Sequence, residues 1–176
     1  MSRCDKEFIS TVCLVPKKTG DFRLVINLKP LNQFVEKIHF KVANNRLALN
    51  CISPGDFILS IDLKDAYFSV PIFQPHRKYS RFLWNFKRYE FTCLPFGYSL
   101  APRVFTKIFK PVIAYFRFLG FRVIIFIDDL ILIVSSYDEC LQQLEVLKQT
   151  LCELGFTVNF EKSQLVPVNE ILYLGS

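Results

Sequence analysis

The sequence is poor in the residues that bind soft metal ions. It has two histidines, His39 and His76, and its six cysteines are scattered single residues with no CxxC pair. A zinc site built from cysteine and histidine is therefore not expected. Isolated cysteines in a chain of this length favour buried free thiols in a reducing compartment.

Signals for export and for a membrane span are also lacking. The opening residues, MSRCDKEFISTV, contain no apolar core of a signal peptide. The apolar run from Pro111 to Val134 is interrupted by Arg117, Arg122, Asp128 and Asp129. Each would cost about 2.5–3.5 kcal/mol near the middle of a bilayer. We expect a soluble, intracellular protein with no membrane partner, in the nucleus or the cytoplasm.

The composition does indicate a folded chain with a basic surface. Of 176 residues 51% are hydrophobic, and 19 are phenylalanine. No repeat or Gly/Ser linker divides the sequence. We therefore expect one domain or two closely joined subdomains. The net charge of +6 favours a polyanionic partner, although a solvated basic surface gives the same count.

Strand and helix patterns alternate along the chain. Two helices are predicted, from Leu100 to Tyr115 behind Ser99, and from Ser136, with Glu139 completing a capping box, to Gly155. Apolar residues at helical spacing mark the buried face of each helix. They are Phe105, Ile108, Phe109 and Val112 in the first, and Leu141, Leu144, Val146, Leu147 and Leu151 in the second.

The predicted strands form hairpins, which indicates an α+β fold with an antiparallel sheet. One hairpin turns at residues 17–21, a second at Lys87-Arg88, and a third at Asp128-Asp129. The strands lie at 11–16, 22–28, 57–61, 81–86, 89–94, 123–127, 130–134, 156–160 and 171–174.

Three aspartates stand at the ends of apolar strands. The stretch FRVIIFIDDLILIV places Asp128 and Asp129 between two apolar runs, and Asp62 ends the run FILSI. Ionised carboxylates are costly to bury and repel one another. Such a cluster suits Mg²⁺ or Mn²⁺, and two such ions stabilise the attacking and leaving oxygens of phosphoryl transfer. The alternative is a solvent-exposed Asp-Asp turn.

Other residues could bind a nucleotide beside these acids. Lys17, Lys18 and Arg23 lie on a hairpin that could reach a triphosphate, or they form a solvated basic tip. Tyr67, five residues after Asp62, could contact a sugar or belong to the core. Gly97 could admit a ligand close to the backbone or be an ordinary turn glycine. No G-x-x-x-x-G-K-[ST] motif occurs, which excludes a P-loop NTPase that would use Asp128 as its magnesium ligand.

These stretches resemble the reverse transcriptase family, in order and over nearly the whole chain. LVPKKTGDFRLVINLKPLN resembles the fingers segment, SIDLKDAYFSVPI the first catalytic-aspartate motif, and LPFGYSLAPRVF the template-and-nucleotide motif. FIDD, VNFEKSQL and ILYLGS resemble the Asp-Asp box, the lysine motif and the primer grip. The style is closest to retrotransposons that carry a tyrosine recombinase. FIDD and LPFG fit reverse transcriptases better than viral RNA-copying polymerases.

The resemblance implies a right-hand polymerase whose palm is an antiparallel sheet with helices on one face. The fingers would comprise residues 1–50 and 71–95, and the palm residues 51–70 and 96–176. The implied reaction is attack of a primer 3′-hydroxyl on a dNTP, directed by an RNA or DNA template.

The resemblance also implies roles for individual residues. Asp62 and Asp128 would ligate two Mg²⁺ ions, which Mn²⁺ could replace, and Asp129 would ligate or support them. For the nucleotide and the primer, the implied residues are Lys17 or Lys18 with Arg23 on the triphosphate, Tyr67 excluding the ribose 2′-hydroxyl, Phe96 and Gly97 in the nucleotide pocket, Lys162 on pyrophosphate, and Tyr173, Leu174 and Gly175 in the primer grip. Lys162 could instead be an ordinary charged strand-end lysine.

The sequence departs from the family where it ends. The family's thumb would follow Ser176, and no RNase H or integrase segment is present. We therefore expect weak template-primer binding, since thumb contacts to phosphates dominate affinity. The chain could be part of a larger polyprotein. An alternative is a truncated, non-catalytic nucleic-acid-binding remnant of a retroelement polymerase.

Overall fold

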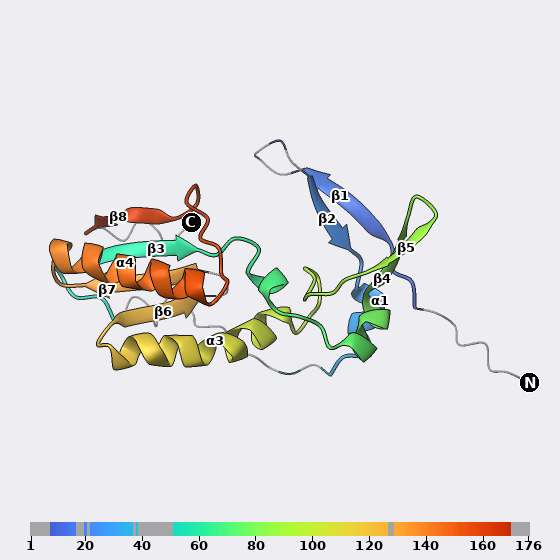
Figure 1. Ribbon diagram of the computed structural model, residues 1–176, viewed down its shortest axis with the longest axis horizontal. Helices are drawn as coiled ribbons and strands as arrows, with labels where there is room; N and C mark the ends of the chain where they lie inside the picture. Colours follow the sequence, from blue (N-terminus) through green and yellow to red (C-terminus); the bar gives the residue numbers. More distant parts are fainter. Residues whose placement is uncertain are drawn as a thin grey trace, which may run out of the picture. The chain divides into compact units, whose positions relative to one another are not determined.

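The computed structural model describes residues 8–16, 20, 22–36, 38, 51–126 and 129–169 (Figure 1). The chain forms two compact units that interleave along the sequence. The first comprises Met1–Ile38 and Tyr67–Pro102, and the second His39–Ala66 and Arg103–Ser176. The predicted borders of fingers and palm stay a prediction.

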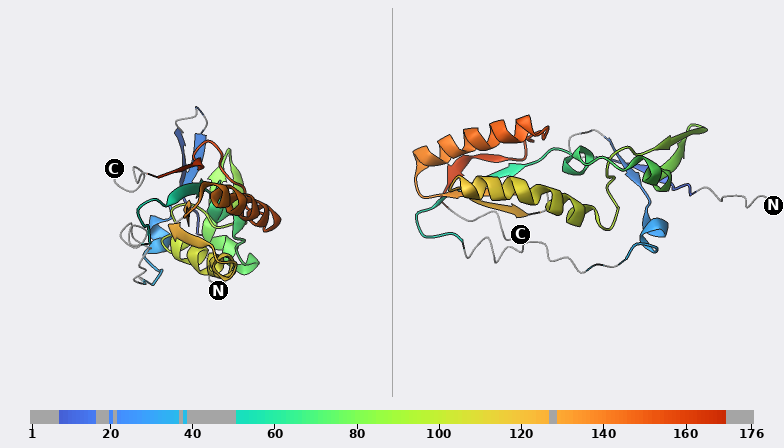
Figure 2. Two further views of the ribbon diagram at one scale, coloured as in Figure 1. Left: turned by 90° about the vertical axis from the view of Figure 1, so that its left-hand side faces the viewer. Right: turned by 60° about the horizontal axis from the view of Figure 1, so that its bottom comes forward.

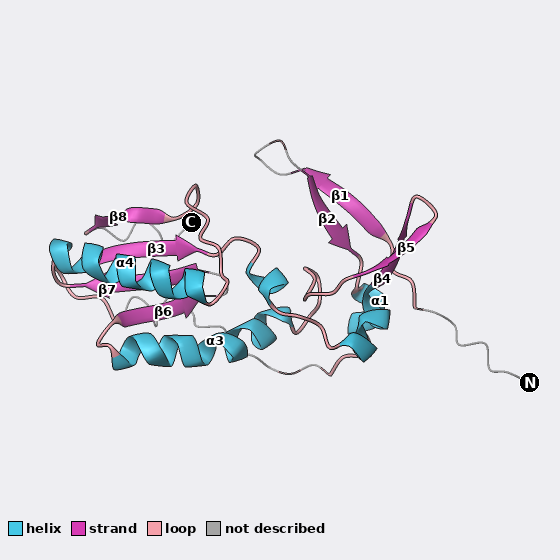
Figure 3. Cartoon of the chain, in the orientation of Figure 1, coloured by secondary structure: helices cyan, strands magenta, loops and turns pink. Residues whose placement is uncertain are grey.

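The first unit is built on two antiparallel hairpins and short helical turns (Figure 3). Strands β1 (Val12–Pro16) and β2 (Phe22–Ile26) pair as predicted. The helical turns are α1 (Lys29–Asn32), η1 (Ala66–Ser69), which starts at the border of the unit, and η2 (Gln74–Ser80). Ile26, Leu28 and Phe82 form its buried core.

The second hairpin turns earlier than predicted. Strands β4 (Arg81–Trp84) and β5 (Lys87–Glu90) pair antiparallel, so the turn lies at Asn85-Phe86 and not at Lys87-Arg88. Both turn residues have positive φ angles, 47° and 60°. A two-residue turn with two positive φ angles usually has the sequence Asn-Gly. Because phenylalanine stands in the glycine position, the sequence pattern did not indicate this turn.

The second unit holds a four-stranded sheet in the order β6-β7-β3-β8, with every neighbouring pair antiparallel. Its strands are β3 (Phe57–Asp62), β6 (Arg122–Phe126), β7 (Asp129–Val134) and β8 (Gln164–Val168). The predicted β6–β7 hairpin is confirmed, although Asp129 belongs to a strand. Leu59, Leu130 and Leu132 are fully buried on one face of the sheet.

Helices α3 (Ala101–Phe118) and α4 (Tyr137–Glu153) lie on that face (Figure 2). Phe105, Phe109 and Phe116 of α3 are fully buried, whereas Ile108 is 50% exposed. The buried stripe of α3 runs through Ala101, Phe105, Phe109, Ile113 and Phe116, so the prediction that Ile108 lies on the buried face was wrong. Val112, the fourth predicted position, is half-buried.

Helix α4 begins and ends close to the predicted residues, but its details differ. Ser136 occupies the N-cap position without a capping hydrogen bond from its side chain. Glu139 instead accepts a hydrogen bond from Gln143. Leu141 and Val146, which were predicted to be buried, are exposed. The buried face of α4 consists of Cys140, Leu144, Leu147 and Leu151. The capping-box contact is therefore wrong, while the helix itself is confirmed.

The predicted strand at 156–160 is not formed. Phe156 packs edge-to-face on Phe109 with ring centroids 5.0 Å apart, and Val158 makes only an isolated bridge to Leu63. The chain then turns and forms β8, which the sequence pattern did not reveal. The strand predicted at 171–174 lies outside the described residues.

The five cysteines that the structure describes are free, but only one of them is buried. Among those described, Cys13, Cys51 and Cys152 are exposed, and Cys140 is buried. The expectation of buried thiols is therefore wrong for three of the cysteines. Burial raises the pKa of the Cys140 thiol.

No helix in the described part of the chain is long and apolar enough to cross a membrane. The apolar run at 111–134 is divided instead between the end of α3 and the β6–β7 hairpin.

The register of α3 can be tested with two adjacent substitutions. We expect Phe109→Ala to lower the free energy of unfolding by about 3–5 kcal/mol, because it empties a fully buried site. Ile108→Ala should change it by less than about 1 kcal/mol, because this side chain is half exposed. Urea unfolding measures both, and equal losses would contradict the register.

Candidate active site

Two of the three predicted acids lie directly opposite each other. Asp62, the last residue of β3, pairs in register with Asp129, the first residue of β7. Cross-strand partners carry their side chains on the same face, with Cβ atoms about 4.5–5.5 Å apart. Both residues are half-buried. The structure therefore brings two carboxylates together at one end of the central strand pair.

The alternation of the strands decides which face carries these acids. Leu59, Ile61, Leu130 and Leu132 point to the helix-covered face and are fully buried. Asp62 and Asp129 therefore lie on the opposite face, where Ser60 and Ile131 form the next pair. Two carboxylates opposite each other repel, so the packing of the helical face holds them against that repulsion.

A turn after α4 fixes the backbone of Asp62. The Asp62 N–H donates to the Ser163 hydroxyl (3.0 Å), which in turn donates to the Asn159 carbonyl (2.7 Å). The Asn159 N–H donates to the Asp62 carbonyl (2.9 Å). Lys162 lies in the same turn and its side chain is exposed. The predicted lysine and first aspartate thus belong to neighbouring segments.

Asp128 lies outside the described residues. Within the described ranges no cluster of three or more His, Cys, Asp or Glu residues could hold a metal ion. The candidate metal ligands among the described residues are therefore Asp62 and Asp129.

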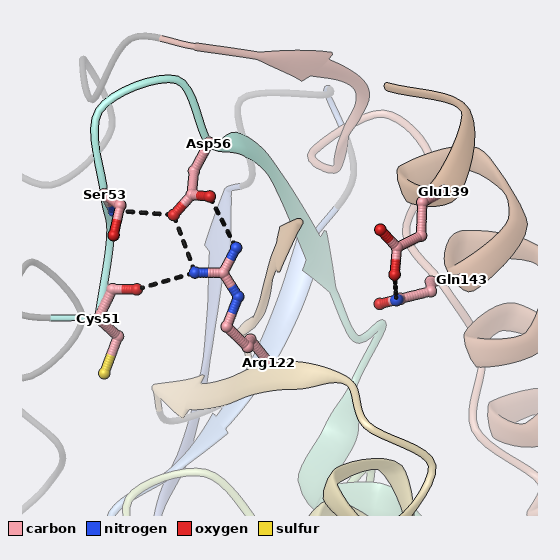
Figure 4. Close-up of polar contacts among 6 residues, drawn as sticks. All are labelled: Cys51, Ser53, Asp56, Arg122, Glu139 and Gln143. Atoms are coloured by element: carbon pink, nitrogen blue, oxygen red, sulfur yellow. Dashed lines mark hydrogen bonds and ion pairs between the residues drawn. The ribbon is translucent and has the colours of Figure 1, made fainter. Parts of the chain in front are cut away.

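An ion pair anchors the opposite end of β3 (Figure 4). Asp56, 5% exposed, accepts two hydrogen bonds from Arg122 at the start of β6 (2.7 and 2.9 Å) and one from the Ser53 N–H (2.8 Å). Arg122 also donates to the Cys51 carbonyl (3.4 Å). The Arg122 hydrogen bonds, followed by that of Ser53, hold the pKa of Asp56 below its usual 3.8.

Two of the predicted nucleotide residues contact each other in the first unit. Tyr67, 7% exposed, packs edge-to-face on Phe96 with ring centroids 5.3 Å apart. Phe68 packs on the same ring at 5.2 Å. Tyr67 therefore belongs to a local aromatic cluster, as the core interpretation of this residue proposed.

The backbone conformation at position 97 requires glycine. Its φ is +96°, and an added Cβ would stand 3.2 Å from the Ile26 carbonyl oxygen. The Gly97 carbonyl accepts a hydrogen bond from the Asn32 side chain (2.8 Å), whose oxygen accepts one from the Ser99 N–H (3.0 Å). These hydrogen bonds join the segment around Gly97, the predicted nucleotide-pocket motif, to α1.

Several predicted site residues cannot be placed. Lys17 and Lys18 lie outside the described residues, as do Tyr173, Leu174 and Gly175. The backbone of Arg23 belongs to β2 and pairs with Val15 of β1.

The chain matches the family model of reverse transcriptase (RNA-dependent DNA polymerase) over residues 15–176. The chain belongs to the reverse transcriptase family. The Gag-Pol polyprotein of gibbon ape leukemia virus is 32% identical over 174 residues, covering 92% of this chain and 10% of the polyprotein. The Gag-Pol polyprotein of koala retrovirus gives the same identity and coverage. The chain thus spans about a tenth of these relatives.

A solved reverse transcriptase shares the fold. The foamy viral protease-reverse transcriptase in complex with double-stranded DNA superimposes with a TM-score of 0.80 and 25% identity. The match covers 95% of this chain and 29% of that chain. The predicted fold class, the α+β fold of reverse transcriptase fingers and palm with an antiparallel palm sheet, is confirmed.

Sequence reasoning missed the residues that position the Asp62–Asp129 pair. Ser163 and Asn159 act on the backbone of Asp62 from 101 and 97 positions away, and no local pattern indicates such contacts. Asp56, six residues before Asp62, carried a weak signal. An acidic residue just before an apolar strand needs a partner when it is buried.

The Asp56–Arg122 pair makes stability depend on pH. The folded-state pKa of Asp56 is lowered, so its contribution is present above about 4 and is lost as the pH falls through the folded-state value. At pH 6, Asp56→Asn should cost about 1–3 kcal/mol, toward the lower end because the Arg122 side chain is 41% exposed. Urea unfolding measures this difference.

The matched control is Glu90→Gln, which breaks the Arg81–Glu90 pair, about one third exposed on each side. It should cost less than about 1 kcal/mol. A difference between wild type and Asp56→Asn that did not shrink below about pH 4 would contradict the role of the carboxylate.

Proposed function

We propose that the chain is a polymerase domain that catalyses RNA-directed DNA synthesis. The observation that carries the proposal is the register of Asp62 with Asp129, in a chain of the reverse transcriptase family. In the reaction the primer 3′-hydroxyl attacks the α-phosphorus of a dNTP and pyrophosphate leaves. An RNA or DNA template directs the choice of dNTP.

The acids fit a magnesium site. Asp62 and Asp129 supply hard oxygen ligands from two rigid strands, and a divalent cation would offset their mutual repulsion. Asp128, next to Asp129 in sequence, is the third proposed ligand. When bound, a pair of Mg²⁺ or Mn²⁺ ions stabilises charge on the attacking and leaving oxygens. The residues around Asp62 contribute rigidity, because both its N–H and its carbonyl are hydrogen-bonded.

We assign the other predicted residues to substrate binding. Lys17 or Lys18, with Arg23, bind the triphosphate of the incoming nucleotide. Tyr67, held by Phe96, excludes a ribose 2′-hydroxyl, and the ordered turn at Gly97 shapes the same pocket. Support comes from the rigid Tyr67–Phe96 contact and from the positive φ of Gly97.

Two further roles rest on the family motifs. Lys162 neutralises or protonates departing pyrophosphate, supported by its place in the turn that holds Asp62. Tyr173, Leu174 and Gly175 begin the primer grip.

We further propose that the chain is part of a larger retroelement polyprotein. The support is that the Gag-Pol relatives are polyproteins of which it spans a tenth. The motif style favours a retrotransposon that carries a tyrosine recombinase.

Loss of one acid should abolish DNA synthesis. We expect the wild-type chain to extend a primed RNA template slowly in Mg²⁺, and Asp128→Asn to reduce dNTP incorporation by more than about a hundredfold. That loss exceeds the 10–100-fold typical of residues outside the ligand shell. Primer extension measures the rate, and circular dichroism confirms folding.

Asp65→Asn is the matched control, since the same change lies three residues beyond Asp62 and outside β3. It should retain the wild-type rate. A folded wild-type chain no more active than Asp128→Asn, even in Mn²⁺, would favour the non-catalytic remnant.

Tyr67 should set the preference for deoxynucleotides. We expect Tyr67→Ala to raise rNTP incorporation relative to dNTP incorporation by about tenfold or more, because an excluding side chain is removed. Single-nucleotide kcat/KM values measure the ratio. Tyr115→Ala, a half-exposed tyrosine on α3, should leave it unchanged, and equal ratios in both variants would contradict the assignment.

A further inference from the structure

Helix α3 has large apolar side chains on two sides. One side is buried in the core of the second unit, but Ile108, Tyr115 and Phe118 are open to solvent. Ile108 is 50% exposed and Phe118 is 87% exposed. Tyr115 follows Ile108 by seven positions and precedes Phe118 by three, so these side chains lie along one side of the helix. Exposed apolar side chains that gather in this way mark interaction surfaces.

Helix α3 also carries charges of one sign only. It contains four basic residues and no acid, which gives it a net charge of +4. Lys107 and Lys110 are exposed, and no ion pair among the described residues uses either of them. Because the two lysines are three positions apart, they repel each other within the helix. An acidic surface is therefore the complement of α3.

Helix α4 carries the opposite charge and lies on the same face of the sheet (Figure 2). Its four acids and one base give it a net charge of −3. The acids are Asp138, Glu139, Glu145 and Glu153. Leu141 and Val146 add exposed apolar side chains, 39% and 41% exposed. The chain therefore contains both a basic and an acidic helix on one face, each with apolar side chains open to solvent.

We propose that the helical face, defined as the exposed surface of α3 and α4, binds the helical face of a second copy of this chain. A two-fold axis along the helix layer lays α3 of each copy over α4 of the other. The basic helix then meets the acidic helix twice, and the exposed apolar side chains cover one another. Such a contact uses the same surface on both copies and closes at the dimer.

A second copy fits this face better than a polynucleotide does. A polyanion would match the lysines of α3, but it would meet the acids of α4 and leave the apolar side chains uncovered. The helical face contains none of the residues of the proposed catalytic site. The inference therefore goes beyond the proposed function and does not depend on it.

Self-association is measured on the full chain, without template, nucleotide or divalent metal. Sedimentation equilibrium over about 1–100 µM protein resolves a micromolar dissociation constant, the weak end for protein interfaces. A reductant is present because Cys13, Cys51 and Cys152 are exposed. We expect a reversible equilibrium between monomer and dimer that weakens as salt is raised, because exposed charges are screened.

Two double variants reverse charges on one helix each. Lys107→Glu with Lys110→Glu changes α3, and Glu145→Lys with Glu153→Lys changes α4. Each variant alone should weaken self-association about tenfold or more, because like charges then face each other across the contact.

An equimolar mixture of the two charge variants tests the pairing of α3 with α4. In the mixed dimer the altered α3 of one copy faces the altered α4 of the other, and the two unaltered helices also face each other. We expect the mixture to associate about tenfold or more tightly than either variant alone. A folding defect in the variants cannot produce this recovery.

Phe118→Ser tests the apolar part of the contact. It should weaken self-association about tenfold, because a large aromatic side chain is removed from the interface. Phe86→Ser is the matched control, since Phe86 is fully exposed on the β4–β5 hairpin. It should leave the dissociation constant unchanged.

Lys78→Glu with Lys87→Glu is the control for charge, because it makes the same change at two exposed lysines of the first unit. It should associate as the wild type does. The proposal is overturned by a monomer mass at every concentration, by a mass that grows beyond two chains, by equal weakening in either control, or by a variant mixture that stays monomeric. None of these outcomes involves DNA synthesis, so failure of the proposed polymerase activity does not affect them.

Discussion

The register between β3 and β7 is the constraint on which the proposed site depends. It places Asp62 opposite Asp129 and, in the same step, directs Leu59, Ile61, Leu130 and Leu132 to the helix-covered face. A slip of one residue in both strands would turn the acids toward the helices and move the leucines to the opposite face. The apolar packing of α3 and α4 therefore fixes the position of two carboxylates that repel each other. The same alternation of side chains along β3 and β7 therefore builds the apolar core and places the two acids.

Polar contacts hold both ends of β3. At its start the Asp56–Arg122 pair connects it to β6, and at its end the Ser163 turn binds the backbone of Asp62. These contacts use hydrogen bonds to charged or backbone groups, whose geometry is directional, whereas hydrophobic burial is not. Hydrogen bonds at its two ends therefore fix the position of β3 along the strand direction, and apolar packing fixes which side chains face the helices. That arrangement suits a strand whose last residue is a proposed metal ligand.

Aromatic residues are buried at one place in the first unit and exposed at another. Around Tyr67 the rings of Phe68 and Phe96 pack on one another, and Tyr67 itself is buried. On the β4–β5 hairpin they are exposed on a strained turn within a basic segment. Burial of Tyr67 suits its proposed exclusion of a hydroxyl group, whereas the rings at the hairpin tip are open to solvent. Phenylalanine content by itself does not distinguish these uses.

The sequence by itself determined the fold class, the β1–β2 and β6–β7 hairpins, the two helices and the acids at the strand ends, because alternation and turn residues act locally. Tertiary structure decided the rest. The pairing of β3 with β7 places Asp62 opposite Asp129, 67 positions away, and Ser163 contacts Asp62 across 101 positions. Phe156 packs on Phe109, and the strand predicted at 156–160 is not formed. Ile108 is half exposed because Phe105 and Phe109 occupy the buried face of α3. Such choices depend on which surfaces meet after folding, and no local pattern contains that information.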